Sequence, residues 1–303
     1  MNVAQILPFS LPKFREQRHF AVKKISISGM QPKYSLKMQD GKLQLTEKNG
    51  EYILKPLYNN DFDFSTEMPA NEHITMQMAK QVFNLDVAEN ALVFFADKTP
   101  AYLTKRFDVL PDGQKTRVED FAQLAGLSGE NRGSGYKYEF SYQKMAQILK
   151  DTVGERNYAK NAEKLFKAVV FNYLVNNGDA HIKNFSVEFP LTEPPRLSPL
   201  YDLMNTRLHL PDGFMALDLF EDGYSTQSFE NLGFFSYADF FEFGKKIGLE
   251  SGVIGEFLGS IQAKIQKINE YLENSALSQA AIAKYKEHIT ERAATFFSPF
   301  IKK

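Results

Sequence analysis

The sequence of 303 residues contains no cysteine. This absence excludes disulfide bonds, zinc sites built from thiolates and a cysteine nucleophile, and it is consistent with a reducing compartment. Neither sign of charge is in excess, because 36 Lys and Arg residues stand against 37 Asp and Glu residues, for a formal net charge of −1. A basic surface that coats nucleic acid is therefore not expected, and we predict no direct nucleic-acid binding.

Long hydrophobic runs are absent as well. The longest apolar run, residues 91–96, is far short of the ~20 residues that a membrane helix needs. The N-terminal segment has no apolar core of a signal peptide, because prolines and basic residues interrupt it. We therefore expect a soluble, cytoplasmic protein that has no membrane partner.

Apolar residues make up 43% of the chain and aromatic residues 14%, enough for a large core without cross-links. The first hundred residues alternate polar and apolar side chains in several short runs, which predict strands at 24–28, 34–38, 51–55, 91–95 and 101–105. Asp40-Gly41 is a hairpin turn signal, and Pro69 stands where a helix would begin.

After residue 107 the apolar spacing becomes helical, at 118–127, 141–149, 162–175 and from 235 to the C-terminal end. Between these helices we predict a Gly/Ser-rich loop at 128–135 and extended segments at 184–189 and 196–200. The sequence thus predicts an α+β fold, with a β-rich N-terminal lobe at 1–107 and a larger helical C-terminal lobe at 108–303.

The segment NGDAHIKN (177–184) places Asp179 five residues before Asn184. This is the spacing of a kinase catalytic loop, in which the carboxylate faces the acceptor hydroxyl and the amide oxygen turns back toward Mg²⁺. Lys183 could offset charge on the transferred phosphoryl group. Taken alone, however, the segment is better explained as an Asn-Gly-Asp turn that carries solvated charges.

Three further segments bear on this interpretation. Asp202 follows a short strand, where it is either a turn residue or a ligand that bridges Mg²⁺ to a triphosphate. Lys55 ends a strand and could contact the α- and β-phosphates, while Glu72 could pair with it or simply favour the helix dipole. Residues 26–33, SISGMQPK, lack the GxGxxG of protein kinases but could cover phosphates with their amides and hydroxyls. The order of these elements along the chain favours a phosphotransferase.

Together these residues resemble the HipA-like serine/threonine kinases of bacterial toxin–antitoxin systems. The matching segments are SISGMQPK (26–33), YILKP (52–56), NEH (71–73), KRFD (105–108), KYE (137–139), NGDAHIKNFSV (177–187) and LSPLYDL (197–203). A full-length HipA carries a further small subdomain before its glycine loop, whereas only about 25 residues precede the loop here. The sequence is therefore most similar to HipT, the short kinase of three-component HipBST systems.

The resemblance implies a two-lobed protein-kinase-like fold that uses ATP and Mg²⁺. It makes Asp179 the general base, assisted by Lys183, and makes Asn184 and Asp202 the metal ligands. Lys105 to Phe107 would form the hinge against adenine through backbone groups, and Asp108 would reach the ribose. The full set of nucleotide-binding residues it implies is Ser28, Gly29, Met30, Gln31, Pro32, Lys33, Lys55, Lys105, Arg106, Phe107, Asp108, His181, Asn184, Tyr201 and Asp202. For His181, bracing the loop is as good an interpretation as proton transfer.

The resemblance also implies regulation and partners. Ser26 and Ser28 would be autophosphorylation sites, at which a phosphate of roughly −1.5 to −2 charges would block ATP. Partners would be a HipS-like small protein and a HipB-like DNA-binding antitoxin. The substrate would be an aminoacyl-tRNA synthetase, glutamyl or tryptophanyl, whose phosphorylation arrests translation. Two alternatives stay open: a small-molecule phosphotransferase on the same scaffold, and a non-catalytic nucleotide-binding regulator.

Overall fold

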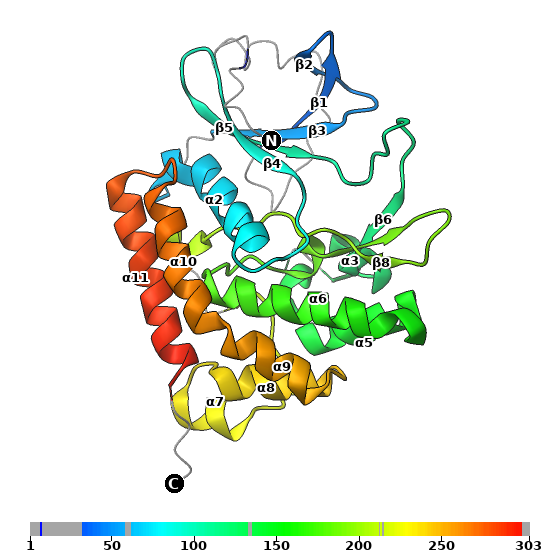
Figure 1. Cartoon of the computed structure of the whole chain (residues 1–303). Coiled ribbons are helices and arrows are strands. Elements are labelled where there is room, and N and C mark those ends of the chain that lie inside the picture. Colours follow the sequence, from blue (N-terminus) through cyan, green and yellow to red (C-terminus); the bar gives the residue numbers. More distant parts are fainter. Residues whose placement is uncertain are drawn as a thin grey trace.

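The computed structural model describes Leu7 and residues 32–57, 62–132, 135–211, 213 and 215–298. These residues form two lobes, with an antiparallel sheet in one and mostly helices in the other (Figure 1). The α+β fold class expected from the sequence is thereby confirmed. In the described part of the chain, no helix has both the length and the apolar character that crossing a membrane requires.

The N-terminal sheet has five strands in the order β2-β1-β3-β5-β4. The strands are β1 (Tyr34–Gln39), β2 (Lys42–Leu45), β3 (Tyr52–Pro56), β4 (Asn90–Phe94) and β5 (Pro100–Lys105). Asp40 and Gly41 both have positive φ, as the predicted tight turn between β1 and β2 requires. Alternate residues, such as Leu36, Leu54 and Leu103, are buried in a small core of their own. The strand predicted at 24–28 lies outside the described residues.

Helix α2 (Met68–Gln81) follows a 3₁₀ turn, η2 (Ser65–Glu67), and packs against β4 and β5. Pro69 stands in its first turn, where the missing amide costs no hydrogen bond. The helix also packs against α10, so that it bridges the sheet and the helical lobe (Figure 1). Its apolar residues belong to the large core of the helical lobe.

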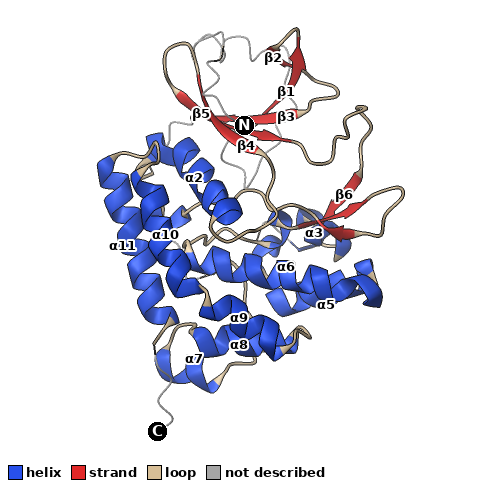
Figure 2. Ribbon diagram, in the orientation of Figure 1, coloured by secondary structure: helices blue, strands red, loops and turns tan. Residues whose placement is uncertain are grey.

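The C-terminal lobe combines a three-stranded sheet, in the order β6-β7-β8, with a set of helices (Figure 2). Its strands are β6 (Arg117–Asp120), β7 (Ser186–Phe189) and β8 (Arg196–Leu197). Its helices are α3 (Phe121–Leu124), α4 (Gly129–Arg132), α5 (Tyr142–Val153), α6 (Glu155–Leu174), α7 (Gln227–Leu232), α8 (Tyr237–Lys246), α9 (Ser251–Gly259), α10 (Ile261–Glu273) and α11 (Gln279–Phe296). Short 3₁₀ turns are η3 (Tyr136–Tyr138), η4 (Ile182–Asn184) and η5 (Thr206–Leu208).

Two expectations for this lobe were wrong. The helix predicted at 118–127 is a strand, β6, followed by the single turn of α3. Antiparallel pairing with β7 fixes the first half as a strand, and Asp120 then begins α3 with a reciprocal capping box to Gln123. A short amphipathic run fits either structure until its partner is known. The loop expected at 128–135 contains the one-turn helix α4.

Candidate active site

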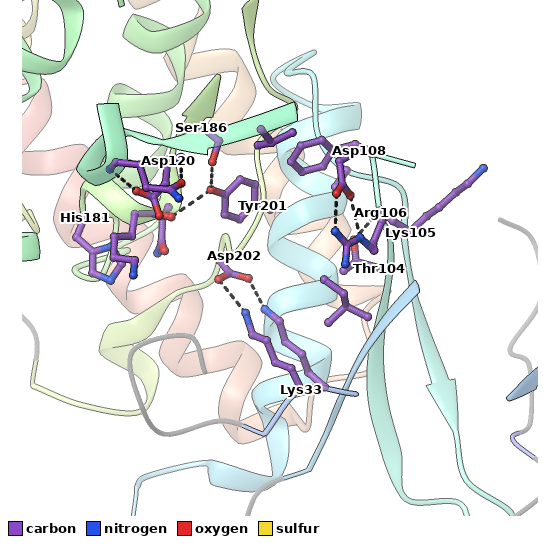
Figure 3. A pocket seen from close by; sticks show the side chains of 18 of the residues that line it. Lys33, Thr104, Lys105, Arg106, Asp108, Asp120, His181, Ser186, Tyr201 and Asp202 are labelled. Carbon is purple, nitrogen blue, oxygen red and sulfur yellow. Dashed lines mark hydrogen bonds and ion pairs between the residues drawn. The ribbon is translucent and has the colours of Figure 1, made fainter. Parts of the chain in front are cut away.

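A cavity of about 840 Å³ lies between the two lobes, a volume suited to a small-molecule ligand (Figure 3). Both lobes contribute to its lining, which comprises Lys33, Ile53, Lys55, Ala88, Thr104, Lys105, Arg106, Phe107, Asp108, Val118, Asp120, Gln123, Tyr136, Lys137, His181, Lys183, Asn184, Ser186, Tyr201 and Asp202. Most of the described residues that the sequence predicts to bind nucleotide line this cavity, but Pro32 does not. The predicted nucleotide-binding residues Ser28, Gly29, Met30 and Gln31 lie outside the described residues, as does Ser26, a predicted autophosphorylation site.

A buried network of ion pairs forms one end of the cavity. The ammonium of Lys55, on β3, lies 2.5 Å from Glu72 Oε1 on α2 and also contacts Asp202 Oδ1. Lys33 Nζ lies 3.5 Å from the other oxygen of Asp202. We call Lys33, Lys55, Glu72 and Asp202 the phosphate-end cluster. Its two cations and two carboxylates compensate one another, as burial of charge requires.

Burial and ion pairing shift the pKa values of the residues in this cluster in different directions. Burial raises the pKa of Glu72 to about 7, despite the nearby ammonium of Lys55. Burial opposes ionisation of Asp202 too, but Lys33 and Lys55 together hold its pKa below the ordinary value. Burial lowers the pKa of Lys33 to about 8. Asp202 is therefore the carboxylate that stays charged, and Glu72 is the one that takes up a proton near neutral pH.

The backbone at Asp202 is held in the left-handed region, with φ of 56°. Aspartate tolerates this conformation better than most residues, which fits a position where a fixed carboxylate direction matters. Preceding it, Tyr201 stacks on Phe107 with ring centroids 5.8 Å apart. The Tyr201 hydroxyl lies 2.5 Å from the Ser186 hydroxyl and donates to the carbonyl of Lys183 at 3.1 Å. Tyr201 thus joins the end of the sheet to the loop around residue 183.

The loop at 177–184 is held by its own hydrogen bonds. The side-chain amide of Asn184 donates to the carbonyl of Asp179 at 2.8 Å, and the His181 amide donates to the same carbonyl. Because its nitrogen is engaged, the Asn184 side chain offers its oxygen to a ligand. The hydroxyl of Tyr142, at the start of α5, donates to the carbonyl of Ala180 at 2.8 Å.

Asp179 lies beside the cavity and is not among the lining residues. Its carboxylate is 28% exposed, and Oδ1 accepts a hydrogen bond of 2.5 Å from the Tyr138 hydroxyl. Lys137 Nζ and His181 Nε2 lie 3.9 and 3.7 Å from the same oxygen. We call Asp179, Lys137, Tyr138 and His181 the acceptor-end group. The side chain of Lys183 is exposed at the cavity.

The His181 ring is buried edge-on against the ring of Tyr138, with centroids 5.3 Å apart. Neither ring nitrogen has a hydrogen-bond partner among the described residues. Burial lowers the pKa of His181 to about 4, although Asp179 opposes this shift, so the ring is neutral at physiological pH. This environment favours a packing role for His181 over proton transfer.

The end of β5 forms the other wall of the cavity. The amides of Lys105 and Arg106 donate to the carbonyls of Glu89 and Glu51, at 2.7 and 2.8 Å. The Lys105 side chain extends away from the cavity (Figure 3). Two nitrogens of the Arg106 guanidinium donate to the Asp108 carboxylate: Nε donates to Oδ1 at 2.8 Å, and Nη2 donates to Oδ2. Asp108 is therefore already paired within the chain.

Comparison with known proteins identifies the family. The profile of the HipA-like C-terminal domain matches residues 25–278, well over half of the chain. The chain belongs to this family. A protein of Haemophilus influenzae named "Putative kinase" is 30% identical over 297 residues, covering 91% of this chain and 83% of the relative. The serine/threonine-protein kinase toxin HipA of Shewanella oneidensis is 26% identical over 203 residues, covering 61% of this HipA-like chain and 44% of that protein.

Two solved structures share the fold. A chain of the Shewanella oneidensis complex of HipA, HipB and operator DNA aligns with a TM-score of 0.68 at 18% identity, covering 98% of this chain and 73% of that one. The Helicobacter pylori kinase CtkA aligns with a TM-score of 0.55 at 14% identity, covering 86% and 93%. At such identities these matches speak to the fold alone. The kinase-like fold and the HipA-like assignment expected from the sequence are confirmed.

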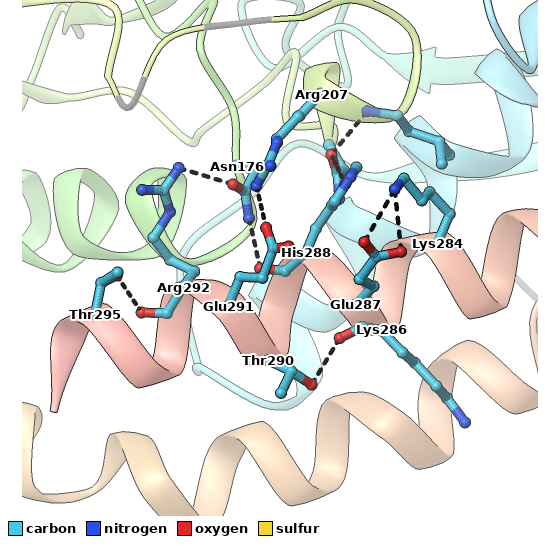
Figure 4. A network of polar contacts seen from close by, with 12 residues as sticks. Asn176, Arg207, Lys284, Lys286, Glu287, His288, Thr290, Glu291, Arg292 and Thr295 are labelled. Atoms are coloured by element: carbon cyan, nitrogen blue, oxygen red, sulfur yellow. Dashed lines mark hydrogen bonds and ion pairs between the residues drawn. The ribbon is translucent and has the colours of Figure 1, made fainter. Parts of the chain in front are cut away.

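A network of polar contacts supports this HipA-like site from behind (Figure 4). Asn176, with φ of 56°, accepts a hydrogen bond of 2.7 Å from Arg292 and donates to the carbonyl of His288 at 3.1 Å. Both partners lie on α11. His288 Nδ1 also lies 3.3 Å from the side-chain oxygen of Asn205, whose carbonyl accepts from Asn71 on α2. One C-terminal helix thus contacts the segment that precedes Asp179 and the segment that follows Asp202.

The sequence argument missed several of these residues. It quoted KYE (137–139) as a matching segment but gave no role to Lys137 or Tyr138, and it gave none to Arg292, because a helical arginine carries no local pattern. It did single out Lys55, Glu72 and Asp202, and the structure brings these three together.

Proposed function

We propose that this HipA-like chain is an ATP- and Mg²⁺-dependent serine/threonine protein kinase. The observation that supports it most is the contact of Lys55 with both Glu72 and Asp202 at the end of an interlobe cavity. A lysine held against the phosphates by a helix glutamate, next to a metal-binding aspartate, is the arrangement that phosphoryl transfer by kinases requires.

The nucleotide would lie with its adenine along Thr104 to Phe107. Among the described residues, the Phe107 amide donates to no backbone carbonyl, so it is free to bind the base. Lys55 and Lys33 would face the phosphates. The carboxylate of Asp202 and the amide oxygen of Asn184 are hard oxygen donors that suit Mg²⁺. Bound there, the ion would neutralise charge on the phosphates.

Asp179 would act as the general base. It accepts the proton of the acceptor hydroxyl while that oxygen forms a bond to the γ-phosphorus and the bond to the ADP oxygen breaks. Its partial exposure fits a group that must meet a protein substrate. Lys183, exposed at the cavity, is placed to offset charge on the transferred group.

We extend the proposal to the biological role from the relatives. HipA of Shewanella oneidensis is named a toxin, and its structure contains HipB and operator DNA. A HipB-like antitoxin is proposed on this ground, whereas a HipS-like small protein, a cytoplasmic location and a glutamyl- or tryptophanyl-tRNA synthetase as substrate are proposed from the sequence resemblance alone. Autophosphorylation at Ser26 and Ser28 and a division between lobes at residue 107 are proposals too.

The proposal is tested with Asp179→Asn. We expect this variant to bind ATP but to transfer labelled phosphate to its own chain and to lysate proteins about 10² to 10⁴ times more slowly. Asp112→Asn is the matched control, since Asp112 is an exposed turn residue. Transfer to small molecules only would favour the small-molecule phosphotransferase, and full transfer by Asp179→Asn would contradict the proposal.

A further inference from the structure

The Tyr138 hydroxyl contacts the carboxylate of Asp179, the proposed general base. It donates to Oδ1 at 2.5 Å, while Lys137 Nζ stands 3.9 Å from the same oxygen. A general base must lie about 2.6–3.2 Å from the oxygen whose proton it removes, so an acceptor hydroxyl has to approach this carboxylate equally closely. An acceptor hydroxyl that approaches Oδ1 from the same side therefore competes with Tyr138 for that oxygen.

The turn that carries Tyr138 separates two concave regions. On one side, Tyr136 and Lys137 line the interlobe cavity. On the other side, Tyr138 and Glu139 border a polar groove of about 320 Å³. Tyr138 thus borders the groove with one part of its surface and contacts Asp179 with its hydroxyl.

The backbone hydrogen bonds of the same turn that lie among the described residues are local ones. The amide of Tyr138 donates to the carbonyl of Gly135, and that of Glu139 to the carbonyl of Tyr136, so these hydrogen bonds are internal to the turn. The Tyr138 ring is 42% exposed, and one buried contact within the lobe is its edge-on packing against the His181 ring. Firm attachment begins at Phe140, whose carbonyl accepts from Asp218. The turn can therefore keep its own backbone hydrogen bonds if it moves as a unit.

We propose that Tyr138 is a built-in stand-in for the acceptor: its hydroxyl holds the acceptor position on Asp179, and the turn Tyr136–Tyr138 withdraws before a protein hydroxyl is phosphorylated. This inference rests on the proposed function, because it needs Asp179 to be the general base. A hydrogen bond to a charged group changes an equilibrium constant by about ten-fold or more. Removing the Tyr138 hydroxyl should therefore free the acceptor position by that factor.

The test uses Tyr138→Phe, which keeps the ring and removes the hydroxyl. Three quantities are measured: ATP hydrolysis without a protein acceptor, the KM for a serine-centred degenerate peptide mixture, and the KM for ATP. We expect the peptide KM to fall about ten-fold and ATP hydrolysis to rise several-fold, with kcat on peptide and the KM for ATP unchanged. Tyr271→Phe is the matched control, because it also loses a hydroxyl bond, 3.1 Å to Gln81, on α10.

The outcomes are distinct. A lower kcat at unchanged peptide KM would mean that Tyr138 orients the base, and it would overturn the inference. Values equal to those of Tyr271→Phe would overturn it as well. If the wild-type chain itself shows no Asp179-dependent transfer, the proposed function fails and this inference falls with it. If wild-type transfer is intact and only the Tyr138 effect is missing, the inference alone fails.

Discussion

The two ends of the cavity satisfy their charges in different ways. In the phosphate-end cluster, the ammonium of Lys55 is 3% exposed and Glu72 is fully buried, and each charge is paired with another side chain of the cluster. In the acceptor-end group, Asp179 is 28% exposed and is covered by one short turn. The first end is set by the packing of α2 on the sheet, and the second by a contact that the chain can release.

This difference separates two tasks. A nucleotide always brings the same charges, so a rigid cluster with compensated cations and carboxylates suits it. A protein acceptor brings a hydroxyl on a chain of variable shape, and an exposed carboxylate behind a movable turn accommodates that. Substitutions at the two ends should therefore change different kinetic constants.

The largest effect is expected from breaking the phosphate end with Lys55→Met. The variant removes the cation between Glu72 and Asp202, and we expect kcat/KM for ATP-dependent transfer to fall by about 10² to 10³-fold. Lys264→Met is the control, since Lys264 packs over the Phe83 ring away from the cavity. A loss of only two- or three-fold would mean that Lys55 is a structural ion-pair partner.

The pH dependence of stability sharpens the comparison next. Burial raises the pKa of Glu72 from 4.5 to about 7, so the folded chain binds more protons than the unfolded chain between these values. Stability from this group is therefore complete below pH 4.5 and falls as the pH rises toward 7. Between pH 5 and 7.5, wild-type protein should lose on the order of 2 kcal/mol relative to Glu72→Gln in urea unfolding.

The control for this measurement is Glu89→Gln, because the Glu89 carboxylate is 51% exposed. It should follow the wild-type pH profile. Parallel profiles for wild type and Glu72→Gln would show that Glu72 stays ionised when buried, and that Lys55 compensates it fully.

Much of the framework was predictable from sequence, for identifiable reasons. Strand β1 alternates buried and half-buried side chains, β3, β4 and β5 are short apolar-rich runs of strand length, and Pro69 marks the start of α2. Asp179 and Asn184 lie in one eight-residue segment, 177–184, so their relative position depends on local sequence. Local patterns of this kind can be recognised without knowing which segments pack together.

The rest depends on contacts between distant residues. Lys33 meets Asp202 across 169 positions, and Tyr138 meets Asp179 across 41, with no periodic signal at either end. The strand β6 was mistaken for a helix because its pairing with β7 decides its structure. In each case the information lies in which surfaces pack together, and a single sequence does not display it.

The smallest predicted effect concerns the support behind the acceptor end. Arg292, on α11, donates to Asn176 at 2.7 Å in a buried position just before the loop that carries Asp179. Arg292→Met leaves that oxygen unpaired, and we expect the free energy of unfolding to fall by about 1.5 kcal/mol. Because the loop would be held less firmly, kcat should fall a few-fold while the KM for ATP, set by the phosphate end, stays unchanged.

A surface ion pair between η5 and the same helix, α11, gives the matched control. Arg207 and Glu291 lie 2.6 Å apart but are 37% and 48% exposed, so Arg207→Met should cost at most about 0.5 kcal/mol and leave kcat unchanged. Urea unfolding and transfer kinetics on the two variants decide the matter. Equal stability losses would mean that burial of the Arg292 contact adds nothing. A change in the KM for ATP with Arg292→Met would show that α11 supports the phosphate end as well, and the two ends would then be one mechanical unit.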